Sequence, residues 1–136
     1  MLQRIQSVWY FLAAIAVFLT LKFPTYSGTN KELIPSTFLN GTSSLIMIFV
    51  TLAVGIICLI TIFLYKNRPL QLKISLLALL LQVVLIYLYY NAISSFVQGT
   101  LSLTSVLHAL VIVFIILGIQ GVRRDEKIIK DSNRLR

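Results

Sequence analysis

The stretch that decides the fold runs from Ile74 to Val122, ISLLALLLQVVLIYLYYNAISSFVQGTLSLTSVLHALVIVFIILGIQGV, and contains no charged residue. A helix that crosses a bilayer needs about 20 apolar residues, so this run is too long for one crossing and suits two. The polar cluster from Asn91 to Thr100 interrupts it, which is typical of a turn between antiparallel helices. The run also lacks the period-two alternation of a barrel strand. We therefore predict helices near residues 73–91 and 101–123.

Two further uncharged runs, Ile5 to Leu21 and Ser43 to Tyr65, predict helices near residues 5–22 and 44–65. The composition agrees, because 58% of the 136 residues are hydrophobic and only 12% are charged, against about 25% in soluble domains. We expect an all-α fold, a polytopic membrane protein built as one four-helix bundle. The expected single domain covers residues 1–136, with an outer loop at 23–43 and a charged tail at 123–136.

The basic residues fall almost wholly in the gaps between the apolar runs. Ten of the twelve would lie on one side of a four-crossing chain, namely Arg4, Lys66, Arg68, Lys73, Arg123, Arg124, Lys127, Lys130, Arg134 and Arg136. Lys22 and Lys31 would lie on the other side. Because Lys and Arg are retained on the cytoplasmic side during insertion, both termini are predicted to be cytoplasmic. The basic residues behind the formal charge of +8 thus serve to orient the chain in the membrane, and we expect no nucleic-acid partner.

The outer loop contains Pro24, Gly28 and Gly41 among Ser, Thr and Asn residues. This composition favours turns over a packed unit. Asn40-Gly41-Thr42 also matches a glycosylation acceptor, although a plain loop turn accounts for it as well. The first apolar run has an alternative interpretation as a signal peptide, with Arg4 as its basic region and Thr25-Tyr26-Ser27 as a poor cleavage signal. Against it, Lys22-Phe23-Pro24 follows the apolar run directly.

Residue patterns of enzymes are absent from the sequence. It has no phosphate loop, no paired carboxylates and no nucleophile beside a base and an orienting acid. Its single cysteine, Cys58, lies in an apolar run and can form neither an internal disulfide nor a multi-cysteine metal site. The four acids are Glu32, Asp125, Glu126 and Asp131, all outside the apolar runs, where a buried reaction could not use them. We expect a non-enzymatic protein with no cofactor and no metal.

Polar and small residues recur at helical spacing inside the apolar runs, for example Ser75, Ala78, Gln82 and Tyr89. Membrane helices use such stripes to approach one another closely, so each is predicted to be a contact face. Folding the last two helices about residue 95 brings Gln82 and His108 to matching depth. We expect an interhelical hydrogen bond between them, because an unpaired amide or imidazole in hydrocarbon is costly. A proton relay, a ligand site and, less readily, a metal site at His108 remain alternatives.

The tail mixes charges with apolar residues, and Glu126 and Lys130 form a favourable i,i+4 pair, so the last helix is expected to extend into it. Mixed signs make a poorer lipid anchor than a purely basic helix and favour a protein contact. The residues expected to contact a partner lie at the two ends of the chain. They are Gln3, Arg4, Arg123, Arg124, Asp125, Glu126, Lys127, Arg134 and Arg136.

The same ends carry a family resemblance. The opening MLQRIQS, the LKFP at residues 21–24, the RDEK at 124–127 and the closing NRLR at 133–136 resemble four-span membrane proteins of Bacteroidota catalogued as domain of unknown function 4293. The resemblance implies a bacterial inner membrane and four helices, and it supplies no activity. We therefore expect an accessory or structural subunit of a larger inner-membrane complex, with lipid and other membrane subunits as partners. The alternative is an oligomeric small-molecule or proton-linked transporter or binder around His108 and Gln82.

Overall fold

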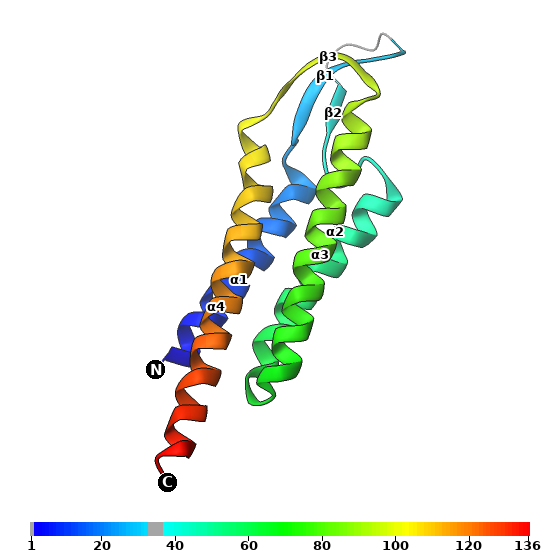
Figure 1. Ribbon diagram of the computed structural model, residues 1–136. Helices are drawn as coiled ribbons and strands as arrows, with labels where there is room; N and C mark the ends of the chain where they lie inside the picture. The colour runs from blue at the N-terminus through cyan, green and yellow to red at the C-terminus, as the bar shows by residue number, and fades with distance from the viewer. Residues whose placement is uncertain (1, 33–36) are drawn as a thin grey trace.

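The computed structural model describes residues 2–32 and 37–136, and the side chains of these apart from residues 2–4 and 30. Four long helices dominate it (Figure 1): α1 (Leu2–Lys22), α2 (Leu45–Phe63), α3 (Arg68–Ile93) and α4 (Val106–Arg134). Each is long and apolar enough to cross a membrane. Large apolar side chains also cover the outside of the bundle, with Phe49 and Phe63 70% and 79% exposed. Such a surface is compatible with a multi-pass membrane protein and unlike that of a soluble domain.

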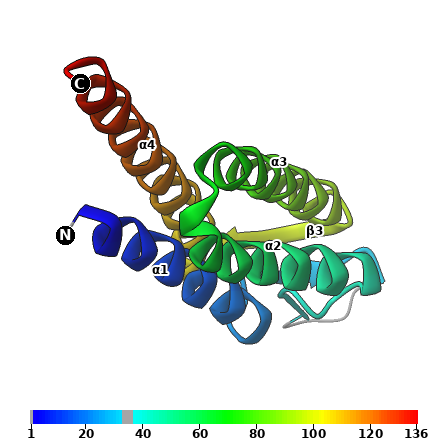
Figure 2. The same cartoon turned by 90° about the horizontal axis from the view of Figure 1, so that it is seen from below.

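The helices pack in the cyclic order α1, α2, α3, α4, with α4 closing the ring against α1. Both chain termini and the turn between α2 and α3 lie at one end of the bundle (Figure 1). At that end α4 runs on past the N-terminus of α1, as the view from below shows (Figure 2). We call this the termini end and the opposite one the sheet end.

A small antiparallel sheet covers the sheet end, with strand order β2-β1-β3. It consists of β1 (Tyr26–Asn30), β2 (Thr37–Leu39) and β3 (Phe96–Leu101). The expected helical class with four long helices is confirmed. The expectation of plain turns at 23–43 and 91–100 is wrong for the residues described, because these connections contribute the small sheet. The Ser, Thr, Asn and Gly residues that favoured turns lie in strands here, because β1 pairs with a segment about 70 residues away in the chain.

Two helices differ from their expected limits. α3 begins at Arg68 instead of near residue 73, after a short 3-10 turn, η1 (Leu64–Lys66), and Pro69 occupies its first turn, where a missing N–H costs nothing. α4 begins at Val106 after a second 3-10 turn, η2 (Leu103–Ser105), and continues to Arg134. Arg, Lys and Glu are good helix formers, so the charged tail continues the helix.

The polar and small stripes are buried at the helix contacts, which confirms that prediction. Ser75, Ala78, Gln82 and Tyr89 of α3 are all buried. The middle of the bundle is a cluster of small and branched apolar side chains from all four helices. Its buried members are Ala13, Ala14, Ala16, Val17, Val54, Cys58, Ala78, Val111, Ile115 and Ile119.

Candidate functional site

A cluster of polar side chains lies inside the bundle near the sheet end, where α3, α4 and the residues after α1 meet. Gln82 Nε2 lies 3.3 Å from His108 Nδ1, and His108 Nε2 lies 3.4 Å from Thr25 Oγ1. If Nδ1 accepts from the Gln82 amide, a neutral ring carries its hydrogen on Nε2 and donates to Thr25. Tyr89 packs on the imidazole with ring centroids 4.6 Å apart. The two residues of the expected interhelical pair are thus together, joined by a third partner from the chain after α1.

The sheet holds Thr25 in this position. The Thr25 N–H donates to Leu39 O at 2.7 Å, and Ser102 N–H donates to Thr25 O at 3.0 Å. The Thr104 hydroxyl donates to Pro24 O next to it. These bonds fix the end of α1 against the beginning of α4, so the sheet helps to position a residue of the polar cluster.

One buried polar atom of this cluster lacks a hydrogen-bond partner. Gln82 Oε1 is buried and has no hydrogen-bond partner among the described residues. A groove of about 520 Å³ opens beside the cluster between α3 and α4, and Tyr89, His108 and Thr25 contribute to its wall. The other walls are largely apolar, from residues such as Ile86 and Ile112. This groove is the one place in the described chain where a buried histidine lines a cavity.

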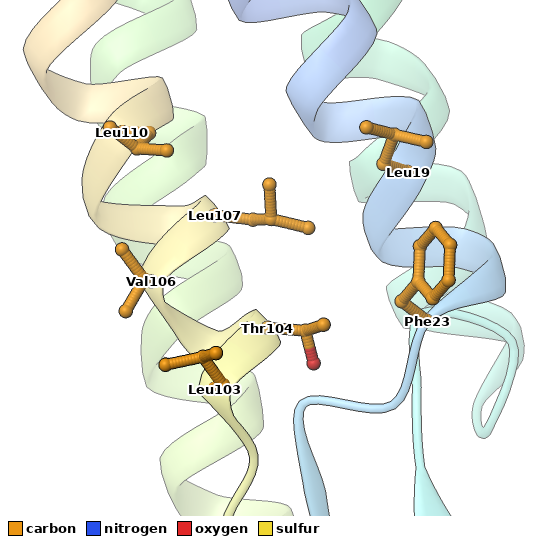
Figure 3. Close-up of a pocket in the computed structure, with 7 residues that line it drawn as sticks. All are labelled: Leu19, Phe23, Leu103, Thr104, Val106, Leu107 and Leu110. Carbon is orange, nitrogen blue, oxygen red and sulfur yellow. The ribbon is translucent and has the colours of Figure 1, made fainter.

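A second groove near the sheet end, between α1 and α4, has a volume of about 390 Å³ (Figure 3). Leu19 and Phe23 line it on the α1 side, opposite Leu107 and Leu110 of α4. Its single hydroxyl, on Thr104, already donates to Pro24 O. The groove therefore offers an apolar surface and no chemistry.

A second set of polar contacts links three helices closer to the termini end. Tyr10 Oη of α1 lies 2.7 Å from Ser75 Oγ of α3, and the Ser75 hydroxyl also lies 2.7 Å from Gln71 O. The Gln71 amide donates in turn to Thr61 O of α2 at 3.1 Å. Tyr10 also packs against Gly118 of α4, where a Cβ would come within 2.6 Å of the ring. This set fixes helix positions and leads to no cavity.

The buried carboxylate of Asp125 forms the third polar contact, at the termini end. The Gln6 amide of α1 donates to Asp125 Oδ2, and Arg68 Nη1 donates to Asp125 O at 3.0 Å. Asp125 is only 7% exposed. Asp125 is therefore buried between helices, although it lies in a charged run outside the apolar stretches and was expected to contact a partner.

The family model described as Domain of unknown function (DUF4293) matches residues 2–135. The chain belongs to this family. The resemblance of its two ends to the family is thereby confirmed. No curated protein and no solved structure matches the chain. Family membership implies no activity, so the function of this DUF4293 member is inferred from its geometry.

Most of the other expected contact residues of this DUF4293 member are accessible. Arg123, Arg124, Lys127, Arg134 and Arg136 are exposed on α4 and just beyond its end. Glu126 is half-buried and forms an ion pair of 2.9 Å with Lys130. Gln3 and Arg4 lie in the first turn of α1, and their side chains are outside the described part of the chain.

The sequence did not indicate a role for Thr25 or Tyr10, and it did not indicate that Asp125 is buried. A signal existed for two of them. Tyr10 falls on the buried stripe of α1 that begins at Gln6, and Asp125 lies three residues after buried Val122 on the face of α4 that meets α1. Thr25 follows a helix-ending proline, and no local pattern marks it. In the described residues no group of three His, Cys, Asp or Glu side chains could hold a metal ion.

Proposed function

We propose that this DUF4293 member is a non-enzymatic accessory or structural subunit of a larger complex in the inner membrane of a bacterium of the Bacteroidota. The observation that carries the proposal is the extension of α4, the helical segment from Arg123 to Arg134 that continues past the bundle. Ile128 and Ile129 on it are 48% and 45% exposed, and Leu135 at its end is 90% exposed. A short helix with unburied apolar residues is marginally stable in water and gains from a protein partner.

The proposed topology has the termini end in the cytoplasm. Ten of the twelve basic residues lie in segments that come together at this end. These segments are the start of α1, the turn between α2 and α3 with the first turns of α3, and the α4 extension. Lys22 and Lys31 belong to the opposite side of the bundle. This distribution is the one that insertion favours.

The interior of the bundle supports a structural role over a transport role. The Gln82–His108–Thr25 cluster and the Tyr10–Ser75–Gln71 contacts are separated by the apolar cluster, including Ala78 and Ile115. A proton relay needs a continuous series of polar groups or water, and side chains from all four helices fill this layer. The polar groups therefore serve best as links between helices.

Extraction in a mild detergent followed by mass spectrometry tests the proposal. We expect stoichiometric co-purification of unrelated membrane subunits with the native chain and its loss in the double variant Ile128→Ser, Ile129→Ser. The matched control is Val97→Ser, which removes an apolar side chain that is 60% exposed on β3, far from the extension. A native chain recovered alone, or as a homo-oligomer, would contradict the proposal.

A second candidate function is binding of a small molecule that enters from the lipid, by an oligomer of the chain, around His108 and Gln82. The groove of about 520 Å³ beside His108 favours it, because it combines apolar walls with a buried, unpartnered amide oxygen nearby. A ligand with an apolar body and a hydrogen-bond donor fits this environment. Mass spectrometry of the purified chain separates the two functions, since a retained organic molecule that is lost in His108→Leu supports binding.

A further inference from the structure

A cleft of about 470 Å³ lies at the termini end, between the turn that joins α2 to α3 and the α4 extension. We propose that it binds the phosphate headgroup of an anionic phospholipid from the adjacent leaflet. The proposal rests on the membrane insertion proposed above and needs no partner complex.

The charges of the cleft suit a phosphodiester. Lys66, Arg68 and Lys130 line it together with one carboxylate, that of Glu126, which leaves an excess of two positive charges. Glu126 is paired with Lys130 at 2.9 Å, so Lys66 and Arg68 carry the charge that is not neutralised locally. Cationic side chains bind phosphate through charge-assisted hydrogen bonds.

Arg68 is held in place before any ligand arrives. Its Nη1 donates to Asp125 O of α4 at 3.0 Å, so one arm of the guanidinium bridges the two walls of the cleft. The other N–H groups of the guanidinium can donate hydrogen bonds to an anion. An arginine fixed in this way loses less conformational entropy on binding than a free surface side chain.

The remaining walls favour a lipid over a soluble anion. Tyr65, Pro69 and Ile129 contribute apolar surface to the same cleft. Phe63 and Leu70, close in sequence to the cleft residues Tyr65 and Pro69, are 79% and 43% exposed and provide further apolar surface at this end of α2 and α3. A molecule with a phosphate headgroup and acyl chains matches both parts, with the headgroup among the cations and the chains along the helices.

Titration of the detergent-purified full chain with a short-chain phosphatidylglycerol, read by native mass spectrometry, tests the site. Phosphatidylcholine with the same chains is the comparison lipid. We expect Lys66→Gln to weaken phosphatidylglycerol binding about fivefold, the effect of one basic residue at an anionic surface. Lys73→Gln removes the same charge from the exposed start of α3, outside the cleft lining, and is expected to leave binding nearly unchanged.

A gain of binding provides the sharper test, because misfolding cannot produce it. Glu126→Gln removes the carboxylate from the cleft and releases Lys130 from its ion pair. We expect it to strengthen phosphatidylglycerol binding several-fold and to leave phosphatidylcholine binding unchanged.

Three results would overturn the proposal. The first is an equal loss in Lys66→Gln and Lys73→Gln, which would indicate diffuse attraction by the whole basic end. The second is unchanged or weaker binding in Glu126→Gln. The third is displacement of the lipid by glycerol 3-phosphate at similar concentrations, which would identify a site for soluble anions. Partner subunits can still co-purify under any of these results, so the lipid site and the accessory role are tested separately.

Discussion

The substitution His108→Leu tests whether the polar cluster is a structural link. It removes two contacts, of 3.3 Å to Gln82 and 3.4 Å to Thr25, both longer than the usual range and therefore weak. Interhelical bonds of this kind contribute about 0.6 kcal/mol each in membrane proteins. The ring contact with Tyr89 adds about 0.5–1.5 kcal/mol. We expect His108→Leu to lower the free energy of unfolding by about 2 kcal/mol.

A companion substitution makes this expectation more specific. In the native chain, Gln82→Leu removes a bonded amide and is expected to destabilise. In the His108→Leu background the same amide is buried without its partner, so replacing it by leucine is expected to stabilise. The effect of Gln82→Leu should therefore change sign between the two backgrounds.

The assay is equilibrium unfolding in mixed micelles of increasing dodecyl sulfate content. The single tryptophan, Trp9, stacks on Phe114 with centroids 5.8 Å apart, so its emission reports separation of α1 from α4. Far-ultraviolet circular dichroism follows helix content in the same samples. Unchanged stability in His108→Leu, or a destabilising Gln82→Leu in both backgrounds, would refute a structural link and favour a ligand role for His108.

Three further predictions concern packing and topology. Gly118→Ala places a Cβ within 2.6 Å of the fully buried Tyr10 ring and should cost about 1–3 kcal/mol in the same unfolding assay, whereas a neutral effect would show that the ring can move. Asp125→Leu leaves the Gln6 amide without its acceptor and should lower the melting temperature in detergent more than Asp125→Asn, which keeps a carbonyl oxygen there; equal losses would contradict the role of this bond. A green fluorescent protein fused to the C-terminus should fluoresce and a fused alkaline phosphatase should be inactive, and the reverse pattern would exclude a cytoplasmic tail.

The helices and their buried faces were predictable because apolar runs and the helical period are local signals. Ser75 and Gln82 are polar residues in an apolar helix, spaced seven apart and so on one face, and both are buried at helix contacts. The approach of Gln82 to His108 followed from the same reasoning, since residues at similar distances from the connection between two antiparallel helices lie at similar depth. Periodicity and antiparallel connection together defined this part of the site.

The sheet was not predictable in the same way. Gly28 of β1 lies opposite Gly99 of β3 in register, and a Cβ on Gly28 would come within 2.1 Å of Gln98 O. These glycines permit a close approach of two strands, but each one alone has the local signature of a turn. Only the bundle brings the two segments together, and Thr25 gains its position beside His108 as a result.

The burial of Asp125 could not be predicted for a different reason. It lies within the charged run Arg123 to Lys127, and such a run usually marks a solvated face. Its burial depends on α1 approaching α4 closely at Gly121, where a Cβ would lie 2.7 Å from Gln6 Cγ. The small residue that admits Gln6 also places the Gln6 amide against Asp125, so packing between two helices far apart in sequence decides the environment of this charge.

The two proposed binding surfaces at the termini end share α4. Ile129 belongs both to the wall of the lipid cleft and to the exposed apolar residues of the extension, and Lys130 lies beside it. A lipid headgroup in the cleft would cover one side of this helical turn and stabilise the extension in the orientation that a partner meets.

Lipid binding and partner binding are then linked, because a ligand that favours one orientation of the extension raises the affinity of any partner that requires that orientation. A phosphate in the cleft would compete with Glu126 for Lys130, and the Glu126 carboxylate would then be available to a basic residue of the partner subunit. Subunit capture by this DUF4293 member should therefore increase with the anionic lipid content of the membrane.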